Sequence, residues 1–149
     1  MTAQTGRIHD KNTQLWLDNS SGTLTNLSAH TISVGAVGLD HEMMDVTGLS
    51  NAVKNFLTGY PSAPLSITFA NDTVVITHLS ALNVNTPLSL GIYYGVRHDW
   101  ESGEPTFGIS SSSTSGYVFG GFTVSEGKIT AKFDVFGPTA PAWGTAAIT

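Results

Sequence analysis

The chain has 149 residues, enough for one domain with a substantial hydrophobic core. Its formal net charge is −5 and its basic residues are scattered, which excludes a groove that holds nucleic acid tightly, because such a groove needs clustered cations. Without cysteine there is neither a disulfide framework nor a thiolate metal site. Charged residues are only 11% of the chain, which suits a β-protein rich in serine and threonine, or a surface that neighbouring subunits cover.

The first half of the chain begins with a polar segment, residues 1–12, which predicts a flexible N-terminal arm. It lacks the apolar core of a signal peptide, and no run of the sequence is long enough for a membrane span, so we expect a soluble protein folded in a cytoplasm. Strands are predicted around residues 15–17 and over residues 31–36. Residues 39–45 are polar with two methionines and predict a projecting loop or hairpin.

The segment 49–58 predicts the helix of the fold. Its apolar residues recur at i, i+3, i+4, i+7 and i+8, which places on one helical face Leu49, Ala52, Val53, Phe56 and Leu57. Thr47 or Ser50 can cap the start of this helix, and Gly59 suits its end. Pro61 then prevents continuation, since proline offers no backbone donor.

The second half of the chain predicts further strands over residues 65–69, 74–77 and 88–96. Its clearest feature is a hairpin of residues 118–124 and 128–135, whose strict alternation places on one face Ile129, Ala131, Phe133 and Val135. The C-terminal tail, residues 138–149, has no periodicity. About eight strands indicate a mainly β fold: one domain over residues 1–149, an antiparallel β-sandwich or barrel flanked by one α-helix.

Two polar clusters are the places to look for chemistry. The first is Asp40-His41-Glu42 with Asp45, but neighbouring residues of a strand point to opposite faces, so a shared metal site needs a special loop. The second is residues 97–101, where His98 stands beside carboxylates, yet the serines of residues 110–113 lack the Gly-x-Ser-x-Gly turn of a nucleophile. We therefore expect no catalytic residue, no metal and no cofactor, and we do not expect an enzyme.

Three tryptophans, Trp16, Trp100 and Trp143, offer another interpretation, a stacking platform for sugars. They lie far apart in the sequence, so core or interface packing is the better explanation of each.

Several segments together resemble the tail tube proteins of bacteriophages. Asp45-Val46-Thr47-Gly48, Lys54 to Gly59 and Leu65 to Phe69 resemble the loop, helix and following strand of that family. The closing strands and tail of the family are similar to Gly116-Tyr117-Val118, the hairpin of residues 122–135, and Pro141 to Ala146. The matching segments cover roughly half of the chain in the same order, whereas residues 97–105 align only loosely.

The resemblance implies a β-sandwich with one helix, in which sheets line up between subunits. Hexameric rings would stack into a tube in the virion tail, formed from subunits made in the bacterial host cytoplasm, and the phage DNA would pass through it without specific binding. Other partners would be the tape measure, terminator and baseplate proteins, and no membrane. The segment before the helix is then the expected inter-subunit contact, with these residues: Leu39, His41, Glu42, Met43, Met44, Asp45 and Val46.

Other classes remain open beside this hypothesis. A tail terminator or a capsid decoration protein would use the same fold in another role. A carbohydrate-binding module would use Trp100 with Tyr93 or Tyr94, and a hydrolase would depend on His98.

Overall fold

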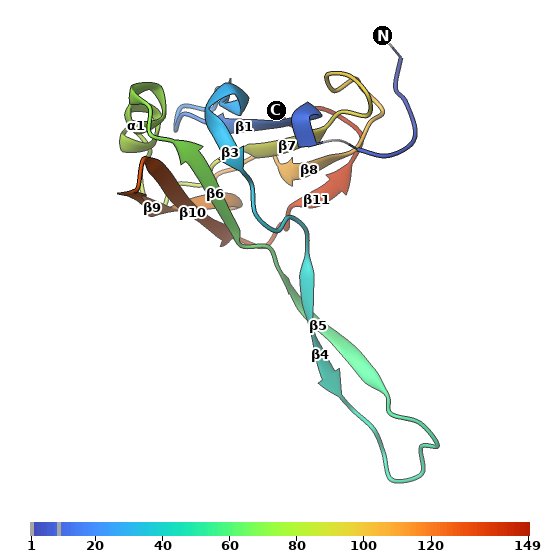
Figure 1. The fold of residues 1–149 in the computed structure, drawn as a ribbon. Helices are drawn as coiled ribbons and strands as arrows, with labels where there is room; N and C mark the ends of the chain where they lie inside the picture. The colour runs from blue at the N-terminus through green and yellow to red at the C-terminus, as the bar shows by residue number, and fades with distance from the viewer. Residues whose placement is uncertain (1, 9) are drawn as a thin grey trace.

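A computed structural model describes residues 2–8 and 10–149, and it consists of a β-sandwich from which one long hairpin projects (Figure 1). Eleven strands lie in these residues: β1 (Thr13–Asp18), β2 (Leu24–Asn26), β3 (Thr31–Ser33), β4 (Asp40–Asp45), β5 (Phe56–Ser62), β6 (Leu65–Ala70), β7 (Leu90–Tyr94), β8 (Thr106–Ile109), β9 (Gly116–Ser125), β10 (Lys128–Phe136) and β11 (Ala142–Gly144). The helix α1 spans Thr73–Ser80, and short 3-10 turns span Asp10–Asn12 and Ser28–His30.

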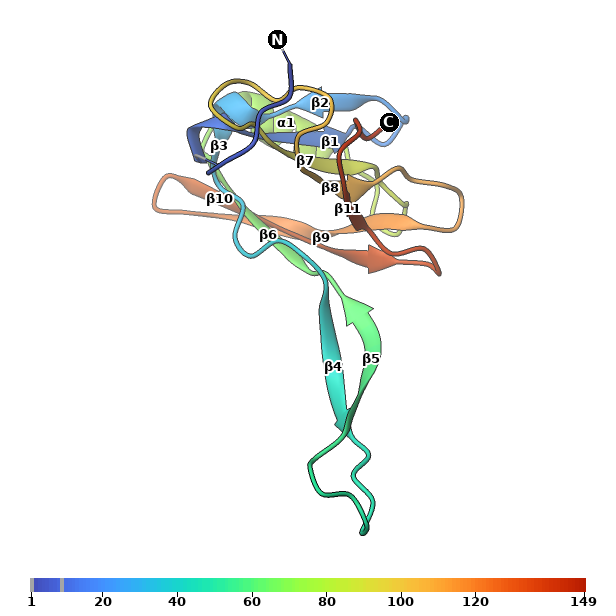
Figure 2. The same ribbon diagram turned by 90° about the vertical axis from the view of Figure 1, so that its right-hand side faces the viewer.

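The sandwich has two layers whose strands pair antiparallel. One sheet has the order β11-β8-β7-β1-β2 and the other the order β3-β6-β10-β9, while β4 and β5 pair only with each other. Both sheets keep open edges, so the fold is a sandwich flanked by one helix and not a closed barrel (Figure 2). The mainly β prediction is thereby confirmed.

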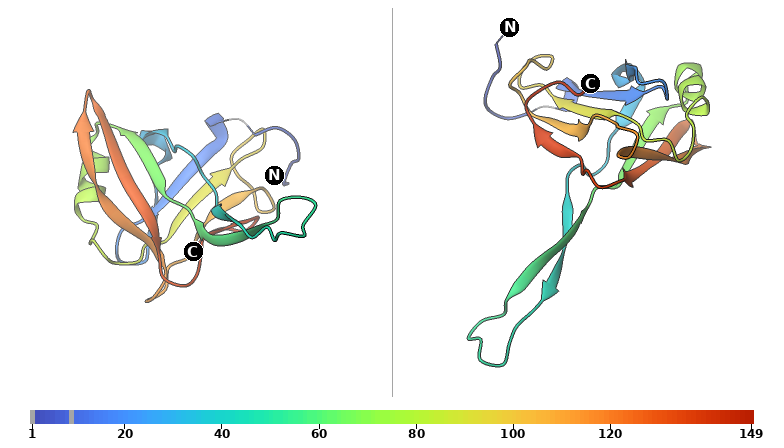
Figure 3. Two further views of the ribbon diagram at one scale, coloured as in Figure 1. Left: turned by 90° about the horizontal axis from the view of Figure 1, so that it is seen from below. Right: turned by 180° about the vertical axis from the view of Figure 1, so that it is seen from behind.

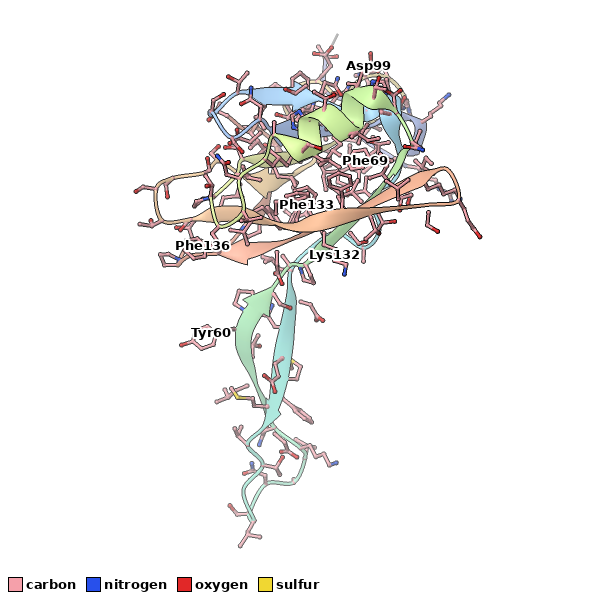
Figure 4. All side chains as sticks on the ribbon, turned by 90° about the vertical axis from the view of Figure 1, so that its left-hand side faces the viewer. Tyr60, Phe69, Asp99, Lys132, Phe133 and Phe136 are labelled. Carbon is pink, nitrogen blue, oxygen red and sulfur yellow. The ribbon has the colours of Figure 1, made fainter. Side chains whose placement is uncertain are left out.

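The core lies between the two sheets, where alternate residues of each strand point inward. β6 buries Leu65, Ile67 and Phe69, and β10 buries Ile129, Ala131 and Phe133. In Figure 4, Phe69 and Phe133 lie between the layers and Lys132 points away from the core. The β9–β10 hairpin forms at the predicted turn, with Ser125 opposite Lys128 and positive φ at the two central residues, but its register shifts between Ala131 and Phe133.

The helix predicted over residues 49–58 is wrong. Residues 46–55 form the loop of the projecting hairpin, and Phe56 begins strand β5. An isolated helix of this length is marginal in water unless its apolar face packs on something, and this segment stands away from the core. Residues 56–62 instead form a strand that pairs with β4.

The helix of the fold lies where the sequence predicted a strand, at residues 74–77. Asp72 caps α1 by accepting a hydrogen bond from the backbone N–H of Val74, at 2.8 Å. Val75 and Leu79, one turn apart, are fully buried against the sandwich. Burial lowers the pKa of His78, near the end of the helix, whose Nε2 lies 3.1 Å from the carbonyl oxygen of Asp18. Residues 74–77 are all β-branched, and because such residues have a low helix propensity the sequence predicted a strand here.

The two ends of the chain are partly integrated into the body. Within the predicted arm, residues 1 and 9 lie outside the described residues, and Gln4 bonds to Glu104. Within the predicted tail, residues 142–144 form β11, which pairs with β8. The unperiodic tail therefore contains an edge strand.

Candidate functional site

The projecting hairpin, residues 40–62, is the most unusual surface of the molecule. It leaves the sandwich as two paired strands and extends away from the body (Figure 1 and the right panel of Figure 3). Apart from the half-buried Gly59, each of its residues is exposed. Residues 40–45, predicted to project as a loop or hairpin that leads into a helix, do project, but as one strand of a hairpin whose second strand is β5.

Both faces of this hairpin carry large apolar side chains. Met44 lies opposite Leu57, while Asp45 lies opposite Phe56 and Met43 opposite Thr58. Because directly opposed residues share a face and neighbours along a strand alternate, Met44 and Leu57 occupy one face and Met43 and Phe56 the other. A hairpin in a folded monomer normally has one face buried against the core and one face exposed to solvent, whereas both faces of this hairpin are exposed.

The exposed apolar residues continue to the tip and back toward the base. Leu49 and Val53 at the tip are 110% and 71% exposed, and Tyr60 near the base is 96% exposed and points outward in Figure 4. Exposed apolar side chains in such numbers are typical of surfaces that bind another protein, since burying each one is worth about 1.5–3 kcal/mol.

A network of polar contacts closes the loop at the tip. Asp45 accepts hydrogen bonds from the hydroxyl and the backbone N–H of Thr47, and the Thr47 hydroxyl in turn accepts one from the N–H of Asn55, at 2.9 Å. The hydrogen bond from the Thr47 hydroxyl, and to a smaller extent the one from its backbone N–H, holds the pKa of Asp45 below its usual value. The tip therefore has a defined shape although it packs on nothing.

The seven residues predicted as a contact do not all share this environment. His41, Glu42, Met43, Met44, Asp45 and Val46 are exposed on or beside β4, while Leu39 packs against the core of the body. The apolar residues of β5 (Phe56, Leu57 and Tyr60) belong to the same surface and were assigned instead to the helix and its end. Because Phe56 and Leu57 are neighbours in the sequence, no period-two pattern marked them as strand residues.

The base of the hairpin is fixed to the body by Tyr117. Its hydroxyl, in a fully buried side chain, donates to the carbonyl oxygen of Ala63 just after β5, at 3.0 Å. Beside it, a groove of about 460 Å³ on the outer face of the four-stranded sheet is lined by the apolar residues Ala36, Pro64 and Val118 and by the charged residues Lys132 and Asp134.

Burial, and secondarily the charge of Asp134, raises the pKa of the Tyr117 phenol well above that of a free tyrosine. The folded state then holds this proton at pH values where the unfolded chain releases it, so the stabilisation is complete below about pH 10 and declines as the pH rises further. We expect Tyr117→Phe to cost about 0.5–1.5 kcal/mol at neutral pH and to weaken this alkaline loss. Denaturant titration of the wild-type and variant proteins at pH 8 and pH 11 measures the free energy of unfolding of each. An equal loss of stability between these pH values in both proteins would contradict the role of Tyr117.

The four-stranded sheet ends in open strands. β3 has three residues, whereas β9 has ten and carries no charge. Folded monomers usually protect such edges with lysine, proline or a covering segment. At the start of β9, Leu88 and Tyr117 exchange backbone hydrogen bonds, and among the described strands β9 pairs with β10 alone.

The polar clusters have other partners than the sequence indicated. Asp40, His41 and Glu42 alternate along the exposed β4, and in residues 2–8 and 10–149 no group of three or more potential ligands is close enough to hold a metal ion. His98 faces Glu104, with 3.7 Å between Nε2 and Oε2, and Nδ1 contacts the carbonyl oxygen of Asp99. Glu104, which the sequence analysis missed, is the buried centre of this loop.

The three tryptophans of the predicted platform are differently placed. Trp16 and Trp100 contact Tyr93, whereas Trp143 lies on β11 against Tyr94 and Phe107 and is 52% exposed. Tyr93 is 6% exposed, lies between the rings of Trp16 and Trp100, and bonds through its hydroxyl to Ile148. The indole N–H of Trp100 donates to the carbonyl oxygen of Glu104. These contacts leave no open stacking face at Tyr93.

Comparison with known proteins adds no family. No protein-family model and no curated protein matches the chain. In the part of the chain that the structure describes, no helix is long and apolar enough to cross a membrane.

Proposed function

We propose that this chain is a structural subunit that works by polymerisation, the major tail tube protein of a tailed bacteriophage. The observation that carries the proposal is the hairpin of residues 40–62, which exposes apolar side chains on both faces. Exposed apolar patches of this kind are typical of surfaces that bind another protein, and neighbouring subunits would cover this one.

The contact is best explained by copies of the same chain. In a twofold dimer, the hairpin of one subunit would pack one of its faces against the same face of the partner's hairpin. The second face of each hairpin would then stay exposed. Head-to-tail contacts have no such restriction, and they generate closed rings or open stacks. The hairpin is then the arm that reaches the next subunits.

The open edges of the four-stranded sheet support the same arrangement. The uncharged β9 of one subunit offers free backbone groups to a neighbouring strand, so that sheets line up around a ring. The low content of charged residues, 11%, also suits a surface that is covered on assembly. The resemblance to phage tail tube proteins agrees with these features at residues 65–69 and in the closing segments over residues 116–146. It does not agree at residues 54–59, which match the family's helix but lie in the projecting hairpin.

Negative-stain electron microscopy of the purified protein at rising concentration tests the proposal. We expect rings, or tubes of one diameter, and their absence at every concentration would contradict self-assembly as the intrinsic activity. A discrete small oligomer would favour a tail terminator, and binding to capsids would favour a decoration protein.

A further inference from the structure

Two distant segments of the chain dock on one turn, at residues 101–104. The backbone N–H of Gln4 donates to Oε2 of Glu104 at 2.8 Å, and the N–H of Gly103 donates to the carbonyl oxygen of Thr145 at 2.9 Å. Residues 2–8 and 145–149 thus meet neighbouring residues of the same turn, on the side of the body away from the hairpin (Figures 1 and 2).

The carboxylate of Glu104 holds this turn together. It is fully buried, and its Oε1 accepts hydrogen bonds from the N–H groups of Glu101 at 3.1 Å and Val96 at 3.4 Å. Burial alone would raise the pKa of Glu104, but the N–H groups of Gln4, Glu101 and Val96 outweigh it and hold the pKa below its usual value. Since a buried carboxylate needs all its donors, losing the N–H of Gln4 disturbs the turn as a whole.

The C-terminal segment depends on this turn and on side-chain hydroxyls. Tyr93 accepts from the N–H of Ile148 at 2.8 Å, Thr106 donates to the carbonyl oxygen of Ala146 at 3.1 Å, and Ser110 accepts from the N–H of Thr149 at 3.1 Å. Gly91 leaves the room that this segment fills, because a Cβ there would lie 2.9 Å from Cγ1 of Ile148. These are individually weak bonds, so the segment can be released without unfolding the sandwich.

The geometry points to a latch in which the turn of residues 101–104 couples the N-terminal and C-terminal segments, so that release of one promotes release of the other. The coupling is reciprocal, as any equilibrium coupling between two sites must be. It is a property of the isolated subunit and holds whatever the subunit assembles into. If the two segments contact neighbouring subunits, the latch keeps both docked until assembly releases them together.

Gln4→Pro tests the latch at its most accessible point. Proline lacks the N–H that Glu104 accepts, and residue 4 lies outside the sandwich. Thr5→Pro is the matched control, because no hydrogen bond of the Thr5 N–H occurs in the described residues. Amide hydrogen exchange is followed by NMR. In Gln4→Pro, exchange at Ile148 and Thr149 should become about tenfold faster, the factor expected for losing a hydrogen bond to a charged acceptor. In Thr5→Pro, exchange at these two residues should stay unchanged.

The reverse experiment uses Tyr93→Phe, which keeps the aromatic packing and removes the hydroxyl that holds Ile148. We expect faster exchange at Gln4 and at Gly103. Faster exchange of residues 2–8 alone in Gln4→Pro, or of residues 145–149 alone in Tyr93→Phe, would show two independent segments and overturn the latch. An equal acceleration of amide exchange in the core strands β6 and β10 would show a global loss of stability and would also overturn the latch.

Discussion

Replacing Met44 and Leu57 with serine is expected to abolish rings and tubes while leaving the subunit folded. These two side chains face each other on one side of the hairpin and touch no part of the body. If each loses about 1.5–3 kcal/mol of burial at a subunit contact, the pair weakens every contact by roughly 10²–10⁴-fold. Electron microscopy and sedimentation at matched concentration measure the loss.

The other face of the hairpin provides an independent variant. Met43→Ser with Phe56→Ser should prevent assembly to a similar extent, because both faces are expected to be covered. The matched control replaces exposed apolar residues of the body, Val74 and Val84, which are 50% and 64% exposed. Thermal unfolding should be nearly unchanged in all variants, within about 0.5 kcal/mol, since each site is on the surface. Tubes that persist in both hairpin variants would contradict the proposed function.

Phe69→Ala is expected to have the largest effect on stability, a loss of about 3–5 kcal/mol. Phe69 is fully buried in β6, paired with Ile129 of β10 on one side and Thr31 of β3 on the other. Its removal leaves a cavity at the centre of the core. For a chain of this length the melting temperature should fall by roughly 10 °C.

Phe136→Ala is the matched control for this experiment. It removes the same side chain from a neighbouring strand, but Phe136 is 46% exposed at the end of β10. Calorimetry should show a change of less than about 1 kcal/mol. Similar losses in the two variants would mean that the core is not where the structure places it.

The sheets could be predicted well because their signal is local. In β10, inward and outward residues alternate without interruption, and Glu126-Gly127 marks the turn before it. The helix could not be placed in the same way. Residues 49–58 have helical spacing but no surface to pack on, and residues 73–80 contain β-branched residues yet bury Val75 and Leu79. In both segments, whether apolar side chains could be buried against the sandwich determined the structure, and the local sequence pattern did not.

The candidate site was only partly predictable for the same reason. Exposure of Met43 and Met44 follows from a projecting segment, which the polar surroundings indicated. Phe56 and Leu57 fit equally well on the face of a helix, so their place on β5 needed the structure. Glu104 could not be recognised at all, because its partners Gln4 and Val96 are brought to it by the fold.

The pairing of strands also sets the order in which the chain can fold. The hairpin pairs residues that are close in sequence, such as Asp45 with Phe56, and hairpins of this kind form in about 1–10 μs. The sandwich must join Leu15 to Ile92 and Trp143 to Phe107, and such non-local sheets form in milliseconds to seconds. The hairpin therefore pairs early and the sandwich closes late, so under the proposed assembly the slow closure of the sandwich sets when subunits able to join become available.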